Sequence, residues 1–233
     1  ALIAGIFSVF SFGMIMVFLG SIKLKLAPRI GVDDAQFGKI VAAFQWTMVL
    51  MAIVGGVALD NFGHRLVIVT GMILAAMAVF MVGRAGSISA ITAACIILGI
   101  GAQCVNLAGN TLIPNLFEDP SAGSNLGNTF FGLGALLVPI LTAYLFRKTT
   151  FSKVMTILSV LMLAPVVSAF LATFPTLEQS FSTTVALALL ANYVTWISAL
   201  TLFCYIGLEV SMAIWITTYA SELGADDGQA SRM

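Results

Sequence analysis

Two long apolar runs of the sequence are joined by the short polar stretch Gly56-Val-Ala-Leu-Asp60-Asn-Phe-Gly63-His64-Arg65. Its pattern is G-x-x-x-D-x-x-G-H-R, so an acid, a glycine and an arginine lie within a few residues of one another. Glycine permits the backbone conformations of a tight turn, and the acid and the arginine can pair with each other and with helix ends. The stretch therefore predicts a polar hairpin between two apolar helices.

The composition is that of a membrane protein. The chain is 60% hydrophobic and 9% charged, and its mean hydropathy is +1.08, more than a soluble domain of 233 residues can bury. A helix needs about 20 mainly apolar residues to cross a bilayer core about 30 Å thick. Seven segments are long enough, and none alternates convincingly with the period of a barrel strand. The sequence predicts an all-α fold embedded in the lipid bilayer, with spans at residues 2–22, 37–59, 67–83, 90–112, 126–146, 154–174 and 196–220.

Charge and residue types exclude several classes of function. Ten basic and ten acidic residues give no net charge and form no Lys/Arg run, so nucleic acid is not an expected partner. The three cysteines have no C-x-x-C spacing and His64 is the sole histidine, so we expect no metal site and no cofactor. The predicted spans contain no Asp or His from which an intramembrane protease could be built. We therefore expect no enzyme.

Four segments carry a resemblance to a known family. The hairpin resembles the loop between helices two and three of the major facilitator superfamily. Asn106-Leu-Ala-Gly-Asn110, which follows Gly99-Ile-Gly-Ala-Gln103, is similar to helix four of the fucose/glucose/galactose:proton symporters. Asn125-Leu-Gly-Asn128-Thr-Phe130 resembles the start of helix five in that family, and Phe203-Cys-Tyr205-Ile-Gly207-Leu-Glu209 resembles its helix seven. The segments follow the family's order along nearly the whole chain.

The resemblance implies an organisation into halves, because facilitators consist of two six-helix bundles. We expect residues 1–174 to form the N-terminal bundle, residues 175–195 the linker, and residues 196–233 the first helix of a truncated C-terminal bundle. The full-length protein is expected to be a monomer in the inner cell membrane.

The polar and aromatic residues of the spans are the candidate solute site. Amides offer donors and acceptors that suit an uncharged polyol such as a sugar, and Asn106 and Asn110 share one helix face. Trp46, Phe130 and Tyr205 can stack on the apolar face of a pyranose. The alternative is structural, because buried amides also join membrane helices and aromatic side chains also pack in their cores. The candidate solute-binding residues are Gln45, Trp46, Gln103, Asn106, Asn110, Asn125, Asn128 and Tyr205.

Glu209 is the sole acid well inside a predicted span. Charged acids at this depth are costly and usually functional, so Glu209 is the candidate proton carrier, or else it pairs with a basic residue elsewhere in the protein. The sequence departs from the symporter family at Ser21 and Asn106, where that family has acids. Lys23 adds a cation where none is expected. Proton coupling through Glu209, coupling to another ion and no coupling all remain open.

The glycines and the hairpin charges have conformational interpretations. We expect Gly56, Asp60, Gly63 and Arg65 to form a gate that stabilises one access state, although a purely structural turn is the alternative. Close helix approach is the predicted role of Gly101, Gly109, Gly127, Gly132 and Gly134.

Two observations compete on orientation. The resemblance implies that the Asp60 hairpin is cytoplasmic, whereas most Lys and Arg residues lie on the opposite side, where the positive-inside rule would put the cytoplasm. The sequence as a whole predicts a secondary transporter for a small polar solute, a sugar, with protons as a possible coupling ion. An efflux pump or facilitator for a drug-like or lipid solute and a seven-helix receptor are the alternatives.

Overall fold

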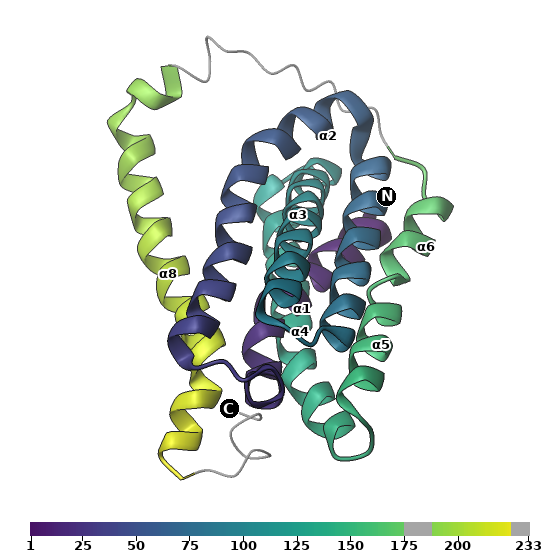
Figure 1. Cartoon of the computed structure of the whole chain (residues 1–233). Helices are drawn as coiled ribbons and strands as arrows, with labels where there is room; N and C mark the ends of the chain where they lie inside the picture. The colour runs from purple at the N-terminus through teal and green to yellow at the C-terminus, as the bar shows by residue number, and fades with distance from the viewer. Residues whose placement is uncertain (175–187, 225–233) are drawn as a thin grey trace.

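A computed structural model describes residues 1–174 and 188–224, which are almost entirely helical and contain no strand. The all-α prediction is confirmed (Figure 1). The helices are α1 (Leu2–Ile30), α2 (Asp34–Arg84), α3 (Ile88–Leu112), the short 3-10 helix η1 (Pro114–Leu116), α4 (Pro120–Phe146), α5 (Phe151–Leu161), α6 (Ala164–Leu171) and α8 (Tyr193–Glu222).

Helix α2 contains two membrane crossings. A straight helix of 51 residues would be about 77 Å long, more than twice the bilayer core. The chain turns back at Gly63, whose φ of 73° and ψ of 166° are not helical. The two arms correspond to the predicted spans 37–59 and 67–83 (Figure 1). The described residues thus hold six helical segments long and apolar enough to cross a membrane, and the two arms of α2 account for the predicted seventh crossing.

Several boundaries differ from the predicted ones for local reasons. Helix α1 continues past residue 22 to Ile30 and ends where Gly31 adopts a left-handed conformation, with φ of 68°. Helix α4 begins six residues before the predicted position 126, at Pro120, because the Asp119 side chain accepts a hydrogen bond from the Ser121 N–H. The predicted span 154–174 is divided into α5 and α6, which begins just before Pro165, a residue without an N–H group.

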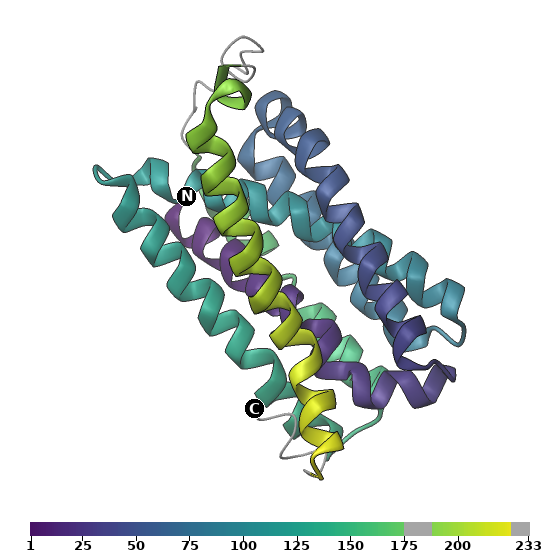
Figure 2. The same ribbon diagram turned by 90° about the vertical axis from the view of Figure 1, so that its left-hand side faces the viewer.

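Helix α1 lies between two groups of packed helices, because it contacts α3 on one side and α4 on the other. Helix α3 lies between the two arms of α2, and α4 runs along α1 (Figure 1). Helices α5 and α6 pack on the second arm of α2, on the side of the bundle away from α8 (Figures 1 and 2). The largest fully buried side chains include Phe18, Phe37 and Phe44, so the core lies where α1, α2 and α3 meet.

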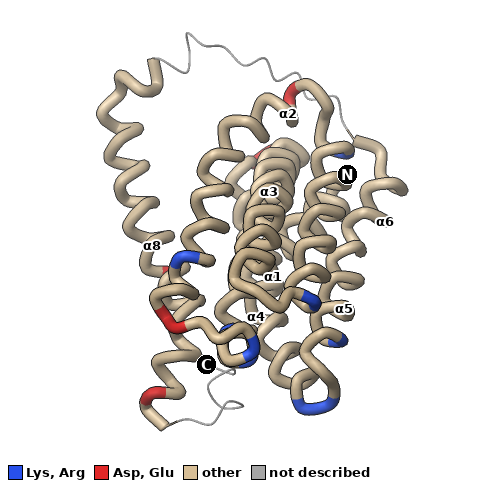
Figure 3. Tube along the Cα trace, viewed as in Figure 1, with Lys and Arg blue, Asp and Glu red and all other residues tan. Residues whose placement is uncertain are grey.

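Helix α8 touches the bundle at one end. Its buried residues are Ile214, Thr217 and Ala220, all in its last third, whereas only 6% of its most apolar window is buried. Figure 1 shows α8 joined to the bundle near the start of α2 and separated from the α2 turn. We call the joined end the basic end, because it holds the Lys and Arg residues at the ends of α1, α2 and α4 and the start of α5 (Figure 3). The end with Gly63 is the hairpin end.

The structure describes only part of the residues on which the predicted division into halves depends. Residues 175–187 of the predicted linker lie outside the described residues, and the last linker positions, from Tyr193, already belong to α8. The boundaries 1–174, 175–195 and 196–233 therefore remain predictions.

Candidate functional site

Three predicted site residues form a continuous chain of hydrogen bonds along α3. The Asn106 amide donates to Gln103 Oε1 over 3.3 Å, and the Asn110 amide donates to Asn106 Oδ1 over 2.6 Å. The helix produces this chain directly, because residues three and four apart lie on the same face. Exposure rises along it: Gln103 is buried, Asn106 is half-buried and Asn110 is exposed.

This chain does not act as a bridge between helices. Every hydrogen bond described for the three amide side chains stays within α3, including a second bond from Asn110 to the Asn106 backbone carbonyl. Among the described residues, no hydrogen bond ends on Asn110 Oδ1, so the exposed end of the chain presents an acceptor. The arrangement can bind a hydroxyl group that donates to Asn110.

Gln45 and Trp46 lie on the first arm of α2. Gln45 Nε2 is hidden from solvent and has no hydrogen-bond partner among the described residues. A buried amide without a partner is costly, so this donor needs an acceptor from a solute, from water or from a further part of the protein. Trp46 is 67% exposed, which leaves its ring available for stacking.

Asn125 and Asn128 lie near the start of α4 and are both exposed, and Phe130 is half-buried. Seen from α8, helix α4 lies on one side of α1 and the first arm of α2 lies on the other side (Figure 2). The described hydrogen bonds do not connect the α4 amides with those of α3. The structure thus places these predicted residues on neighbouring helices without joining them into one cluster.

Tyr205 and Glu209 form a second polar pair on α8. They are one helical turn apart, both are exposed, and the Tyr205 hydroxyl lies within hydrogen-bonding reach of the Glu209 carboxylate. Both lie in the part of α8 that is not packed on the bundle. The described residues give Glu209 no ion-pair partner.

The hairpin charges are arranged differently from the predicted pair. Arg65 donates to the backbone carbonyl of Ala172, and its guanidinium lies 5.6 Å from the centre of the Phe174 ring. Arg65 therefore binds the segment directly after α6. Asp60 is exposed and forms no ion pair among the described residues. Arg65 contacts the end of α6, which lies in the same predicted half, and no Asp60–Arg65 ion pair forms among the described residues.

His64 follows the turn and points into the bundle. Its Nε2 lies 3.0 Å from the Thr111 hydroxyl, which fixes the hairpin to the last turn of α3. Burial lowers the pKa of this imidazole, and the nearby charge of Asp60 partly opposes the shift. The shift in pKa favours the neutral form of His64.

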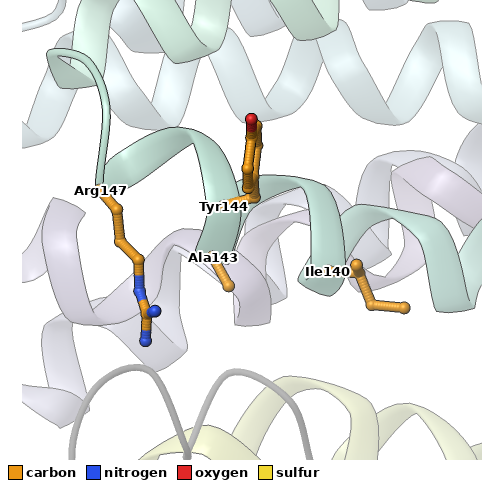
Figure 4. A pocket seen from close by; sticks show the side chains of 4 residues that line it. All are labelled: Ile140, Ala143, Tyr144 and Arg147. Carbon is orange, nitrogen blue, oxygen red and sulfur yellow. The ribbon is translucent and has the colours of Figure 1, made fainter.

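A cavity outside the predicted site lies at the last turns of α4. Its volume is about 390 Å³, and it is lined by Ile140, Ala143, Tyr144 and Arg147 (Figure 4). None of the predicted solute-binding residues lines this cavity.

The family is decided by comparison of the whole sequence. A sequence model described as Major Facilitator Superfamily matches residues 1–231. The chain belongs to the major facilitator superfamily. It is a multi-pass integral membrane protein, and it is not an enzyme.

Two solved structures resemble this chain. One is the crystal structure of a D-xylose-proton symporter, with a TM-score of 0.71 and 14% identity over 99% of this chain and 63% of that one. The other is a variant of the E. coli fucose:proton symporter, with a TM-score of 0.66 and 20% identity over 96% of this chain and 65% of that one. These likenesses confirm the fold, and the chain spans under two thirds of the length of either structure. A search of curated protein sequences found no match.

Sequence reasoning singled out Lys23 as an unexpected cation but did not place it in the candidate site. It is only 2% exposed, and its amine lies 2.9 Å from Asp34 Oδ1 and 2.7 Å from the Thr218 hydroxyl. The ring of Trp215 lies 4.0 Å from the amine. The sequence offered one signal, since a lysine directly after an apolar run needs a partner if the helix continues past it.

The turn of the hairpin motif gives the first prediction. Gly63→Ala should lower the free energy of unfolding by about 1 to 3 kcal/mol, because φ of 73° with ψ of 166° is a conformation that essentially only glycine adopts. Gly56→Ala is the matched control, since Gly56 is helical and a Cβ there would meet open space. The measurement is thermal unfolding of the full-length facilitator in detergent. Equal melting temperatures for the two variants would contradict the prediction.

Proposed function

We propose that this chain is part of a secondary transporter that moves a small polar solute, a sugar, across the membrane by alternating access. The observation that carries the proposal is the amide chain of Gln103, Asn106 and Asn110. It is an uncharged polar surface within an apolar helix, and its exposure to solvent increases from Gln103 to Asn110. Neutral donors and acceptors match the hydroxyl groups of a sugar, and an acceptor is free at the exposed end. The two similar structures are described as symporters of D-xylose and of fucose, which adds support.

The remaining predicted residues complete the proposed solute site. Trp46 and Tyr205 are 67% and 61% exposed, so both rings are available to stack on a pyranose. Asn125 and Asn128 add exposed amides on α4. The unpartnered Gln45 Nε2 is a further donor for the solute or a bound water. In this proposal the two halves rock about a site near the midplane, as in other transporters of this architecture.

Glu209 is the proposed proton carrier. It lies within an apolar helix, where an acid is expensive unless it has a function, and Tyr205 lies one turn earlier on the same helix face. Ser21 and Asn106 are not acids, and among the described residues no acid other than Glu209 lies inside a predicted span.

The test is uptake of labelled neutral sugars by the full-length protein in proteoliposomes, with and without an inward proton gradient. We expect gradient-driven accumulation in the wild type. Glu209→Gln should reduce accumulation to the equilibrated level, because glutamine cannot carry the proton, while exchange without a gradient survives. Glu222→Gln, a change of an acid at the end of the same helix, is the control and should transport like the wild type.

Three outcomes separate the parts of this proposal. Uptake that ignores both the gradient and the Glu209 substitution would leave a facilitator and reject proton coupling. Accumulation that needs the gradient but survives Glu209→Gln would reject Glu209 as the carrier. No uptake of any sugar would reject the sugar assignment in favour of export or of a more apolar solute.

A further inference from the structure

Lys23 connects three helices at the basic end. It lies in α1, Asp34 is the first residue of α2, and Thr218 and Trp215 belong to α8. The ammonium is held by the Asp34 carboxylate at 2.9 Å and the Thr218 hydroxyl at 2.7 Å. The rings of Trp215 and Phe37 lie 4.0 Å and 5.5 Å from it and meet edge to face.

The partners of Lys23 belong to two helices, α2 and α8, and only those on α8 depend on where α8 lies. Asp34 and Phe37 are on α2, so the first bundle supplies them in any position of α8. Thr218 and Trp215 reach Lys23 only while the last third of α8 is docked. Gly20 of α1 belongs to the same contact, because a Cβ there would lie 2.8 Å from Ile214 Cα. The Gly20 carbonyl also accepts a hydrogen bond from the Thr217 hydroxyl over 3.3 Å.

The rest of α8 shows what this contact controls. The buried residues of α8 are confined to this end, and from Tyr193 to Glu209 every residue except the half-buried Thr195 is exposed. Figures 1 and 2 show α8 crossing α1 at the basic end. The bundle and α8 are therefore closed at the basic end and apart at the hairpin end.

We propose that Lys23 is a latch that holds the basic end closed by binding Thr218 and Trp215 of α8. The latch rests on the proposed function in one respect, namely that α8 moves with the second half during alternating access. When the basic end opens, Lys23 keeps Asp34, loses the hydroxyl and the indole, and becomes exposed to water. The latch thus stabilises one access state without contacting the solute.

The test measures the distance between spin labels at positions 39 and 219 of the full-length protein, with Cys95, Cys104 and Cys204 replaced by serine. Lys39 and Tyr219 are both exposed and lie on α2 and α8 beside the latch. The wild-type label pair should give mainly the short distance of a closed end. Thr218→Val should raise the ratio of open to closed populations roughly tenfold, because a hydrogen bond to a charged group is lost while the Lys23–Asp34 pair survives.

Matched variants separate the latch from general damage. Ser221→Ala removes a hydroxyl whose hydrogen bond stays within α8, to the Thr218 carbonyl, and should leave the distances unchanged. Lys23→Met should open the end at least as far as Thr218→Val does, whereas Lys153→Met, which removes an exposed lysine, should not. Thr218→Val tests the latch even if Lys23→Met fails to fold.

The outcomes are independent of transport. Distances for Thr218→Val that coincide with those of the wild type and Ser221→Ala would overturn the latch. Distances that shift as expected in a protein that takes up no sugar would support the latch and reject the sugar assignment. Sugar uptake with unshifted distances would do the reverse.

Discussion

Gly134→Val is expected to separate α1 from α4 and to destabilise the bundle by about 3 kcal/mol or more, the upper part of the range for overpacking. A Cβ at Gly134 would overlap the Phe10 backbone carbonyl of α1 and would lie 3.2 Å from Met14 N. The crossing is reciprocal, because a Cβ at Gly13 would overlap the Phe131 carbonyl. Backbone atoms cannot move aside as a flexible side chain can, so the helices themselves must shift.

Gly132→Val is the control for this crossing. Gly132 lies on the same helix, and a Cβ there would meet nothing within 4 Å. Both substitutions place a β-branched residue in α4, so the difference between them reports the contact with α1 and cancels the helix propensity. The measurement is thermal unfolding of the full-length protein in detergent, followed by loss of the monodisperse peak in size-exclusion chromatography. A Gly134→Val variant as stable as Gly132→Val would show that the helices do not meet at this glycine.

The same pair of glycines shows what the sequence could predict of the packing. Close helix approach was predicted for both Gly132 and Gly134. It is confirmed at Gly134 and is wrong for Gly132 in the described structure. Positions two apart in a helix point about 200° apart, so the two residues cannot face the same neighbour. A glycine-rich run therefore predicts that some helix passes closely but not which glycine it touches. Close approach is also confirmed at Gly101, where a Cβ would lie 2.5 Å from the Gly71 carbonyl oxygen. At Gly127 a Cβ would make only ordinary van der Waals contact.

The hairpin shows the same contrast between local and distant information. The turn at Gly63 was predicted, and the backbone confirms it with a positive φ. A Cβ at Gly56 of the same motif would meet open space, and the close contact is at the neighbouring Gly55, where a Cβ would lie 2.6 Å from a Leu107 methyl. A turn depends on a few adjacent residues, whereas the facing residue of a helix depends on the whole bundle.

The candidate site was predictable where it is local to one helix. The shared face of Asn106 and Asn110 follows from their spacing, and the hydrogen bonds of α3 realise it. The Lys23 contacts could not be predicted in this way, because Thr218 is 195 residues away along the chain. The lysine was also assigned to a connection after residue 22, whereas α1 continues to Ile30 and buries it.

Asn106→Leu is expected to weaken the sugar transport proposed here more than any other single amide substitution. Asn106 is the middle member of the chain, since it donates to Gln103 Oε1 and accepts from Asn110. Leucine has a similar size but leaves the buried Gln103 Oε1 without its donor, and a buried polar group left unsatisfied costs about 1 to 3 kcal/mol. The exposed Asn110 amide loses its bond to Asn106 Oδ1 and keeps only the bond to the Asn106 backbone carbonyl, so its acceptor is less firmly oriented.

The expected result is a rise in KM of roughly tenfold or more, since each 1.4 kcal/mol of lost binding corresponds to a factor of ten. Thr92→Val is the control on the same helix, because the Thr92 hydroxyl bonds only to the Ile88 carbonyl one turn earlier. The measurement is the concentration dependence of uptake in proteoliposomes, together with thermal unfolding of each variant. A variant that melts earlier but keeps the wild-type KM would assign the amide chain to the stability of α3 and remove it from the solute site. A raised KM would support the assignment of the amide chain to the solute site, and the melting temperature of the variant reports separately how much the chain stabilises α3.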